Sequence, residues 1–209
     1  MTDIHFHDKV VYFFLAAALS ILIPAPGRFA YGVALLLIFN FQIVTGLLFS
    51  RLINKLQLNS LKNALMAMEI IASTIFCKQV LVFICPVMAL TLGFVVYLPA
   101  LSATIIDFLF KENEHSLKKD VTLKMLLSGS FSLCALLFFL IRDIFGYGTF
   151  TMIAYKHIAV FSLFAFDKQI SASSFLATIP GALLLLAFFF FVYVAVKNNY
   201  IVLKRSSQA

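Results

Sequence analysis

The residues from Ala172 to Val196 form an uncharged run of 25, which Lys197 ends. At about 1.5 Å per residue, a helix of that length covers about 37 Å, which is more than the roughly 30 Å hydrocarbon core of a bilayer. A surface helix of a soluble domain carries polar residues along one side, and this run has no such side. The run therefore predicts a transmembrane helix and restricts the class of protein that the chain can form.

The composition of the whole chain agrees with a membrane class. Of the 209 residues, 63% are hydrophobic and only 12% are charged, and the mean hydropathy is +1.04. Soluble domains have roughly 25% charged residues. The net charge is +7, but the basic residues lie between apolar runs, so they indicate orientation in a lipid bilayer and not nucleic-acid binding.

Counting uncharged stretches predicts an all-α, polytopic protein with a single integral membrane domain over residues 1–209. The long stretch that joins the fifth span to the sixth includes an apolar segment, Ile158 to Phe166, which is too short to cross and is expected to lie at the interface or re-enter. The six predicted spans are residues 10–27, 29–50, 61–82, 85–108, 121–141 and 172–196.

The distribution of basic residues predicts the orientation. With six spans, both termini share one side with the second–third and fourth–fifth connections, and that side carries eleven of the 16 Lys and Arg residues. The opposite side carries the other five. By the positive-inside rule, both termini are expected in the cytoplasm.

Six spans divide into three and three, and an odd number in each half makes the halves inverted if they are repeats. Pro24 in span one and Pro99 in span four lie in similar short stretches, Leu-Ile-Pro-Ala and Tyr-Leu-Pro-Ala. A proline removes a backbone donor and interrupts a helix. A 3+3 inverted repeat with broken helices in spans one and four is therefore the prediction, and two ordinary membrane prolines are the alternative.

Charged residues within or beside the spans are the candidates for function. Glu69 lies in span three, seven residues after Lys62, and a charge at such depth needs a partner or a water-filled surface. Asp107 ends span four. Both are candidates for an ion path. The alternatives are that Glu69 bonds a neighbouring helix, and that Asp107 and the pair Arg142-Asp143 only anchor helix ends.

The sequence shows no arrangement for catalysis or for a metal. Cys77, Cys85 and Cys134 lie in apolar sequence without a CxxC spacing, and their odd number predicts no disulfide framework. His5 and His7 near the N-terminus are expected to belong to a frayed end and not to a metal site.

Two stretches of the second half resemble a known family. Leu140 to Thr149, with Arg142, Asp143, Gly146, Gly148 and Thr149, resembles the Arg-Glu-(x)2-Gly-x-Gly-Thr stretch of the Rnf/Nqr membrane subunits. Phe175 to Ala182, which includes Pro180, resembles the start of the last span in the Rnf E-type and Nqr D-type subunits. The resemblance covers residues from about Lys124 to Tyr200, and it is only topological before that.

The resemblance implies a six-span subunit of a redox-driven ion pump in a bacterial inner membrane. Its partners would be a related six-span subunit and the other subunits of the complex. In the family, a cysteine from each of two broken helices helps to bind a 2Fe–2S cluster. Here Ile23 stands at the first position, and Leu98 to Ile105 contains no cysteine. No cofactor is therefore expected, a shifted ligand at Cys85 being the alternative.

The chain is accordingly predicted to be a structural or ion-path-forming subunit of such a translocase, and at most a non-catalytic one. Two other functions stay open. A six-span chain of this length also suits a vitamin-type transporter subunit, for which Asn40, Gln42, Thr45 and Glu69 would supply a polar pocket. A membrane scaffold or assembly protein is the third possibility.

Overall fold

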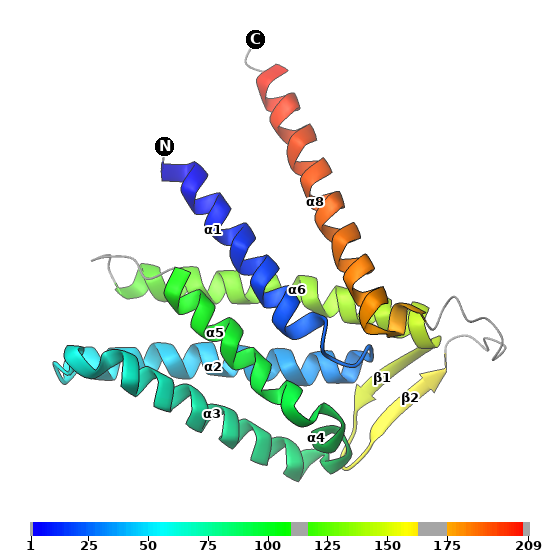
Figure 1. Ribbon diagram of the computed structural model, residues 1–209, viewed down its shortest axis with the longest axis horizontal. Helices are drawn as coiled ribbons and strands as arrows, with labels where there is room; N and C mark the ends of the chain where they lie inside the picture. Colours follow the sequence, from blue (N-terminus) through cyan, green and yellow to red (C-terminus); the bar gives the residue numbers. More distant parts are fainter. Residues whose placement is uncertain (1, 110–116, 163–174, 207–209) are drawn as a thin grey trace.

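A computed structural model describes the backbone of residues 2–109, 117–162 and 175–206, and most of the chain is helical. Three long helices form its central layer: α2 (Phe29–Lys55), α3 (Lys62–Ile84) and α6 (Leu117–Tyr147). They run side by side, with α2 packed between α3 and α6 (Figure 1). This layer is the frame on which the other elements pack.

The remaining helices cross the central layer obliquely. The helix α1 (Thr2–Ala17) continues into the π-helical turn η1 (Ala18–Leu22) and packs against α5 (Leu98–Leu109). The two helices run in opposite chain directions (Figure 1). The last helix, α8 (Ile179–Ser206), begins beside the C-terminal end of α6 and slopes away from the layer (Figure 1).

Within the described residues, four helical stretches are long and apolar enough to cross a membrane: 29–55, 62–84, 86–104 and 124–147. These coincide with the predicted second to fifth spans. The start at residue 29 agrees, and the other boundaries differ by one to six residues. The first and sixth predicted spans match shorter apolar helices, Val10–Leu22 and Ile179–Ala195. Residues 172–174 of the predicted sixth span lie outside the described residues.

The fourth predicted span is interrupted before Pro99. Cys85 leaves the helical conformation, because the residue before a proline is disfavoured there, and Pro86 begins the short helix α4 (Pro86–Leu92). Gly93 ends it at a φ of +50°, and the 3-10 segment η3 (Gly93–Tyr97) leads into α5. Pro99 therefore lies in the first turn of α5, where a proline is tolerated. Pro24 follows η1 in the turn that leads into α2.

A β-hairpin at one end of the bundle departs from the all-α prediction (Figure 1). The strand β1 (Thr149–Ile153) pairs antiparallel with β2 (Ile158–Ser162), with Thr149 opposite Ser162 and Ile153 opposite Ile158. The apolar segment expected to re-enter the membrane thus supplies a strand as far as Ser162. The Lys156 amide donates to the Ile84 carbonyl at 2.9 Å, so the tip of the hairpin caps the end of α3.

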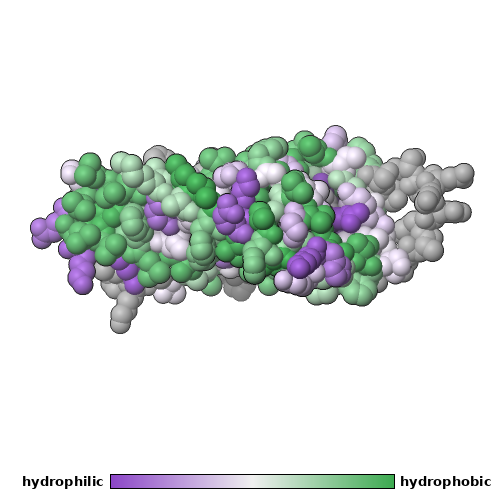
Figure 2. Space-filling view, turned by 90° about the horizontal axis from the view of Figure 1, so that it is seen from below, coloured by the Kyte–Doolittle hydropathy of each residue, from purple (hydrophilic) through white to green (hydrophobic). Residues whose placement is uncertain are grey.

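Phenylalanine rings fill the core between α1, α2 and α6. Phe13, Phe39 and Phe131 are buried, and the Phe131 ring contacts those of Phe13, Phe14 and Phe39 at centroid distances of 5.6–5.7 Å. Tilted and edge-on contacts of this kind are favourable geometries for aromatic rings. The outer face over α3 and α4 is also largely apolar, with hydrophilic side chains in separate patches (Figure 2).

Candidate functional site

The pair Arg142-Asp143 lies near the C-terminal end of α6 and is fully buried, with 1% and 0% of the two residues exposed. The Arg142 guanidinium donates to five backbone carbonyls, the longest bond being that from Nη2 to Thr178 O at 3.5 Å. Its Nη1 reaches Leu22 O and Ala25 O, both at 3.0 Å. Its Nε reaches Leu176 O at 3.2 Å and its Nη2 reaches Ala177 O at 2.9 Å. One side chain therefore joins the end of η1, the turn that follows it and the segment before α8.

The Asp143 carboxylate binds the other side of the same junction. Its Oδ2 accepts from the Thr151 amide at 2.8 Å, the Thr151 hydroxyl at 2.7 Å and the Phe29 amide at 3.1 Å. Its Oδ1 accepts from the Thr149 hydroxyl at 2.9 Å. Phe29 is the first residue of α2, so the carboxylate also lies at the positive end of that helix dipole.

Other residues of the stretches Leu140 to Thr149 and Phe175 to Ala182 also shape this junction. Gly148 has a φ of +65°, a conformation that glycine adopts without a steric penalty. A β-carbon on Gly146 would lie 3.1 Å from the Ala177 amide nitrogen, so the missing side chain allows the close approach. Pro180 lies in the first turn of α8, where its missing donor is not needed. Arg142 and Asp143 thus lie near the end of α6 and form the buried centre of a junction between several segments.

A second group of polar side chains lies inside the bundle, between α2 and α3. Gln42 is 1% exposed and stands 13 residues from either end of α2, so it lies roughly 20 Å from both ends. Its Nε2 donates to the Thr74 hydroxyl at 2.8 Å. Its Oε1 is buried and has no hydrogen-bond partner among the described residues.

Glu69 lies on α3, about one helical turn away from Gln42. Its Oε2 is also a buried oxygen without a partner in the described part of the chain, and it would lie 3.8 Å from a β-carbon placed on Gly46. Native proteins satisfy the great majority of buried polar atoms, so two orphaned oxygens between the same two helices need an explanation. A water molecule, a proton or a cation would supply the missing interaction.

A small cavity of about 30 Å³ opens beside Gln42 and Gly46. Helices α2, α3, α5 and α6 all contribute to its wall, and Lys124 of α6, only 5% exposed, is the charged residue among those that line it. The lining residues are Gln42, Ile43, Gly46, Leu47, Met66, Ile70, Ala103 and Lys124. The sequence analysis named Gln42 and Glu69 together only for the alternative of a transporter pocket, and it counted Lys124 only among the basic residues that orient the chain.

The other polar candidates are occupied. Asn40 Nδ2 donates to the Leu36 carbonyl at 2.7 Å and to the Ser132 hydroxyl at 2.8 Å, and the Ser128 hydroxyl bonds Asn40 Oδ1. The Thr45 hydroxyl donates to its own helix, at Phe41 O and Gln42 O. Asp107 lies in α5, but its side chain is outside the described ones.

Asn40 is therefore a bridge between α2 and α6, and its loss has a predictable size. We expect Asn40→Leu to lower the free energy of unfolding by about 0.6–1.7 kcal/mol, the range measured for hydrogen bonds between membrane helices. Chemical unfolding in detergent, followed by circular dichroism, measures the change. Asn40→Gln is the matched variant, because it keeps the amide on a longer stem. An unfolding free energy unchanged in Asn40→Leu would contradict this role.

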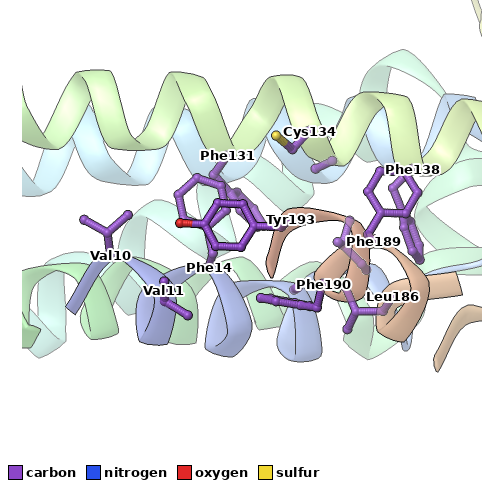
Figure 3. A pocket seen from close by; sticks show the side chains of 13 residues that line it. Val10, Val11, Phe14, Phe131, Cys134, Phe138, Leu186, Phe189, Phe190 and Tyr193 are labelled. Atoms are coloured by element: carbon purple, nitrogen blue, oxygen red, sulfur yellow. The ribbon is translucent and has the colours of Figure 1, made fainter. Parts of the chain in front are cut away.

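A larger cavity of about 320 Å³ lies between α1, α6 and α8, and its wall is almost wholly hydrocarbon (Figure 3). Four aromatic rings point into it, those of Phe14, Phe131, Phe189 and Phe190 (Figure 3). Its polar side-chain groups are the Tyr193 hydroxyl and the Cys134 thiol. Sites for small solutes combine an apolar wall with several converging polar groups. This cavity has the volume of such a site without the polar groups.

Possible metal ligands are not gathered together in the described part of the chain, which holds no cluster of three or more His, Cys, Asp or Glu residues. Cys85 is buried at the junction of α3 and α4. The Ser20 and Ser102 hydroxyls bond each other at 2.5 Å where η1 meets α5. These two serines therefore join η1, which precedes Pro24, to α5, which contains Pro99.

The fold and these sites define a polytopic, mostly helical membrane protein with apolar helices long enough to cross a bilayer. Comparison with protein-family models, with curated proteins and with solved structures finds no match.

Proposed function

We propose that the chain is a divergent membrane subunit of an ion-translocating electron-transport complex of the Rnf/Nqr type, which forms part of an ion path and does not carry electrons. In this proposal it has six spans in a bacterial inner membrane, with both termini cytoplasmic. It packs beside a related six-span subunit.

The Arg142 junction is the observation that carries the proposal. The two stretches with the family resemblance lie about 35 residues apart, and Arg142 bonds directly from the first to the carbonyls of Leu176 and Ala177 in the second. Random similarity gives no reason for two such stretches to meet. Asp143 stands where the family has glutamate, and it also holds Thr149 and Thr151 of the hairpin.

The inverted repeat has geometric support in the pairing of η1 and α5. The turn η1 ends just before the chain segment that contains Pro24, and α5 begins one residue before Pro99. The helix α1, which leads into η1, and α5 run in opposite chain directions (Figure 1), and η1 meets α5 through Ser20 and Ser102. Serine hydroxyls and Ile23 do not supply the thiolates that iron–sulfur clusters need. An ion-path role without electron transfer is consistent with this set of residues.

Two alternatives make different predictions. A vitamin-type transporter requires a polar solute pocket, whereas Asn40 and Thr45 bond helix partners and the cavity beside Gln42 has room for only about 30 Å³. If the chain is a scaffold or assembly protein, its deletion should change the abundance of its partner proteins and leave their rate of turnover per molecule unchanged. Affinity purification of the tagged chain from gently solubilised native membranes, followed by mass spectrometry, should recover a related six-span subunit. Recovery of the chain alone would contradict the proposal.

The ion-path role predicts a specific loss in Glu69→Gln. The variant keeps the size of the side chain and removes the charge, so we expect redox-driven ion uptake by inverted membrane vesicles to fall to a small fraction of the original rate. Ser73→Ala is the matched control, because Ser73 lies one turn away on α3 and its hydroxyl only bonds Ile70 O. Normal uptake in Glu69→Gln, with the complex at normal abundance, would remove Glu69 from the path.

A further inference from the structure

We infer that the cavity beside Gln42 and Glu69 holds water and delivers protons to Glu69, so that the ion bound inside this chain is a proton and not a metal cation. This inference deepens the proposed function, on which its physiological meaning rests, because it names the ion. It is carried by the size of the cavity, by two orphaned oxygens and by the small number of oxygen ligands among the described lining residues.

The size of the cavity suits water. To hold one water molecule, a cavity needs about 10–15 Å³ of space for the centre of a water-sized sphere, together with two to four polar partners. The cavity between α2, α3, α5 and α6 has about 30 Å³, which is room for one or two. A cavity lined only by hydrocarbon would stay dry, so its polar partners decide whether it is filled.

Gln42 gives the first partner. It lines the cavity, it is 1% exposed, and its Oε1 has no partner among the described residues. The amide orientation is fixed by the bond from Nε2 to the Thr74 hydroxyl, which itself donates to the Ile70 carbonyl at 2.6 Å. The free oxygen is therefore held in place, and it can accept a hydrogen bond from a water O–H.

Glu69 gives the second partner. Its orphaned Oε2 lies close to Gly46, which also lines the cavity. Glu69 is not itself a lining residue, but a β-carbon on Gly46 would lie 3.8 Å from Glu69 Oε2 and 3.8 Å from Cε of the lining residue Met66. Gln42 and Gly46 are four residues apart on α2, so the two orphaned oxygens lie about one helical turn apart, and we infer that water connects them.

A metal cation would find few ligands in this cavity. Hard metal cations take six or more oxygen ligands, whereas among the described lining residues only Gln42 has a side-chain oxygen. A proton needs only the Glu69 carboxylate and a water molecule to carry it.

The proton step is simple and balanced. A hydronium ion in the cavity gives one proton to Glu69 Oε2, an O–H bond forms on the carboxyl group, and a neutral water remains. Release reverses the step, with the proton returning to a water molecule. Gln42 takes no proton, and it positions the water by accepting a hydrogen bond.

Infrared difference spectroscopy on the full chain in proteoliposomes tests the inference. Stepping the pH downwards should produce the C=O band of a protonated carboxyl group that is missing in Glu69→Gln. On perfusion with D₂O this band should shift rapidly. In Gly46→Ala, whose added methyl makes only an ordinary 3.8 Å contact with Glu69 Oε2 but fills the cavity, the shift should be several-fold slower. Gln42→Leu should slow it as well, and Ser73→Ala should not.

Sodium provides the decisive comparison. Replacing choline chloride by sodium chloride at constant pH should leave the Glu69 band unchanged. Loss of the band in sodium would show that a metal cation displaces the proton, and it would overturn the inference. The same holds if the band is missing at every pH, or if Gly46→Ala exchanges as fast as Ser73→Ala. These readouts use the isolated chain, so they are separate from the purification test of the proposed complex.

Discussion

Arg142→Ala should be among the most destabilising single substitutions in this protein. We expect it to lower the free energy of unfolding by about 3–5 kcal/mol, because several buried carbonyls lose a hydrogen bond from a charged donor, and each such bond contributes about 1.5–3 kcal/mol. The substitution leaves the carbonyls of Leu22, Ala25, Leu176 and Ala177 without this donor. Chemical unfolding in detergent and the abundance of the chain in membranes both measure the effect.

Arg142→Lys separates charge from geometry. The lysine keeps the positive charge but has a single ammonium with three donors in place of a planar fork with five. Because the carbonyls that Arg142 binds belong to two segments of chain, we expect lysine to satisfy one segment and to recover only part of the stability. Equal stability of Arg142→Lys and the original chain would show that charge alone matters. If Arg142→Ala were as stable as the original chain, the hydrogen bonds of Arg142 would not stabilise the fold.

The sequence was sufficient for the class of protein and for most of its long helices. Uncharged runs predict helices that can cross a membrane without any knowledge of tertiary contacts, because every backbone group in a lipid-exposed segment must be satisfied within the segment. The stretches 29–55, 62–84, 86–104 and 124–147 have this property. Helix ends were less predictable: α6 continues past Ile141 to Tyr147, because Arg142 and Asp143 find partners that make their burial possible.

The hairpin could have been found from local signals. Thr149 to Ile153 and Ile158 to Ser162 are short runs rich in β-branched and aromatic residues, which favour strands. Four residues separate them, and one of these, Lys156, adopts a φ of +65°. The high hydropathy of the surrounding chain led to an interfacial or re-entrant prediction for the second run. Apolar composition and strand propensity coincide in such short runs, and composition alone does not distinguish them.

Which residues meet at each site could not be predicted, because the contacts join parts of the chain that are far apart in the sequence. Glu69 was identifiable because a carboxylate inside a span is costly. Nothing in the sequence near Gln42 indicates that its amide meets Thr74, 32 residues later, or that Lys124 faces the same cavity. The carbonyl partners of Arg142 were even less accessible, since backbone carbonyls have no sequence signature and lie up to 120 residues away.

Asp143→Ala is the second substitution for which we expect a large effect. The carboxylate is the acceptor for two backbone amides and two hydroxyls, in the first turn of α2 and in β1. Each buried donor left without an acceptor costs about 1–3 kcal/mol, and the two amides have no freedom to rotate towards another one. We therefore expect a loss of about 2–5 kcal/mol of unfolding free energy, measured by the same chemical unfolding as for Arg142.

Asp143→Asn shows which of these contacts matter most. Asparagine has nearly the same shape but only one acceptor oxygen, and its NH₂ group is a donor that would face the donors now bound by the second carboxylate oxygen. If the Oδ2 contacts to Phe29 and Thr151 dominate, the amide oxygen can take that place and the variant should recover much of the stability. If the negative charge at the N-terminus of α2 dominates, Asp143→Asn should be nearly as unstable as Asp143→Ala. Asp143→Glu restores the charge on a longer stem, as in the Arg-Glu stretch of the similar subunits, and a folded Asp143→Glu protein would show that the junction accommodates the residue expected from the resemblance.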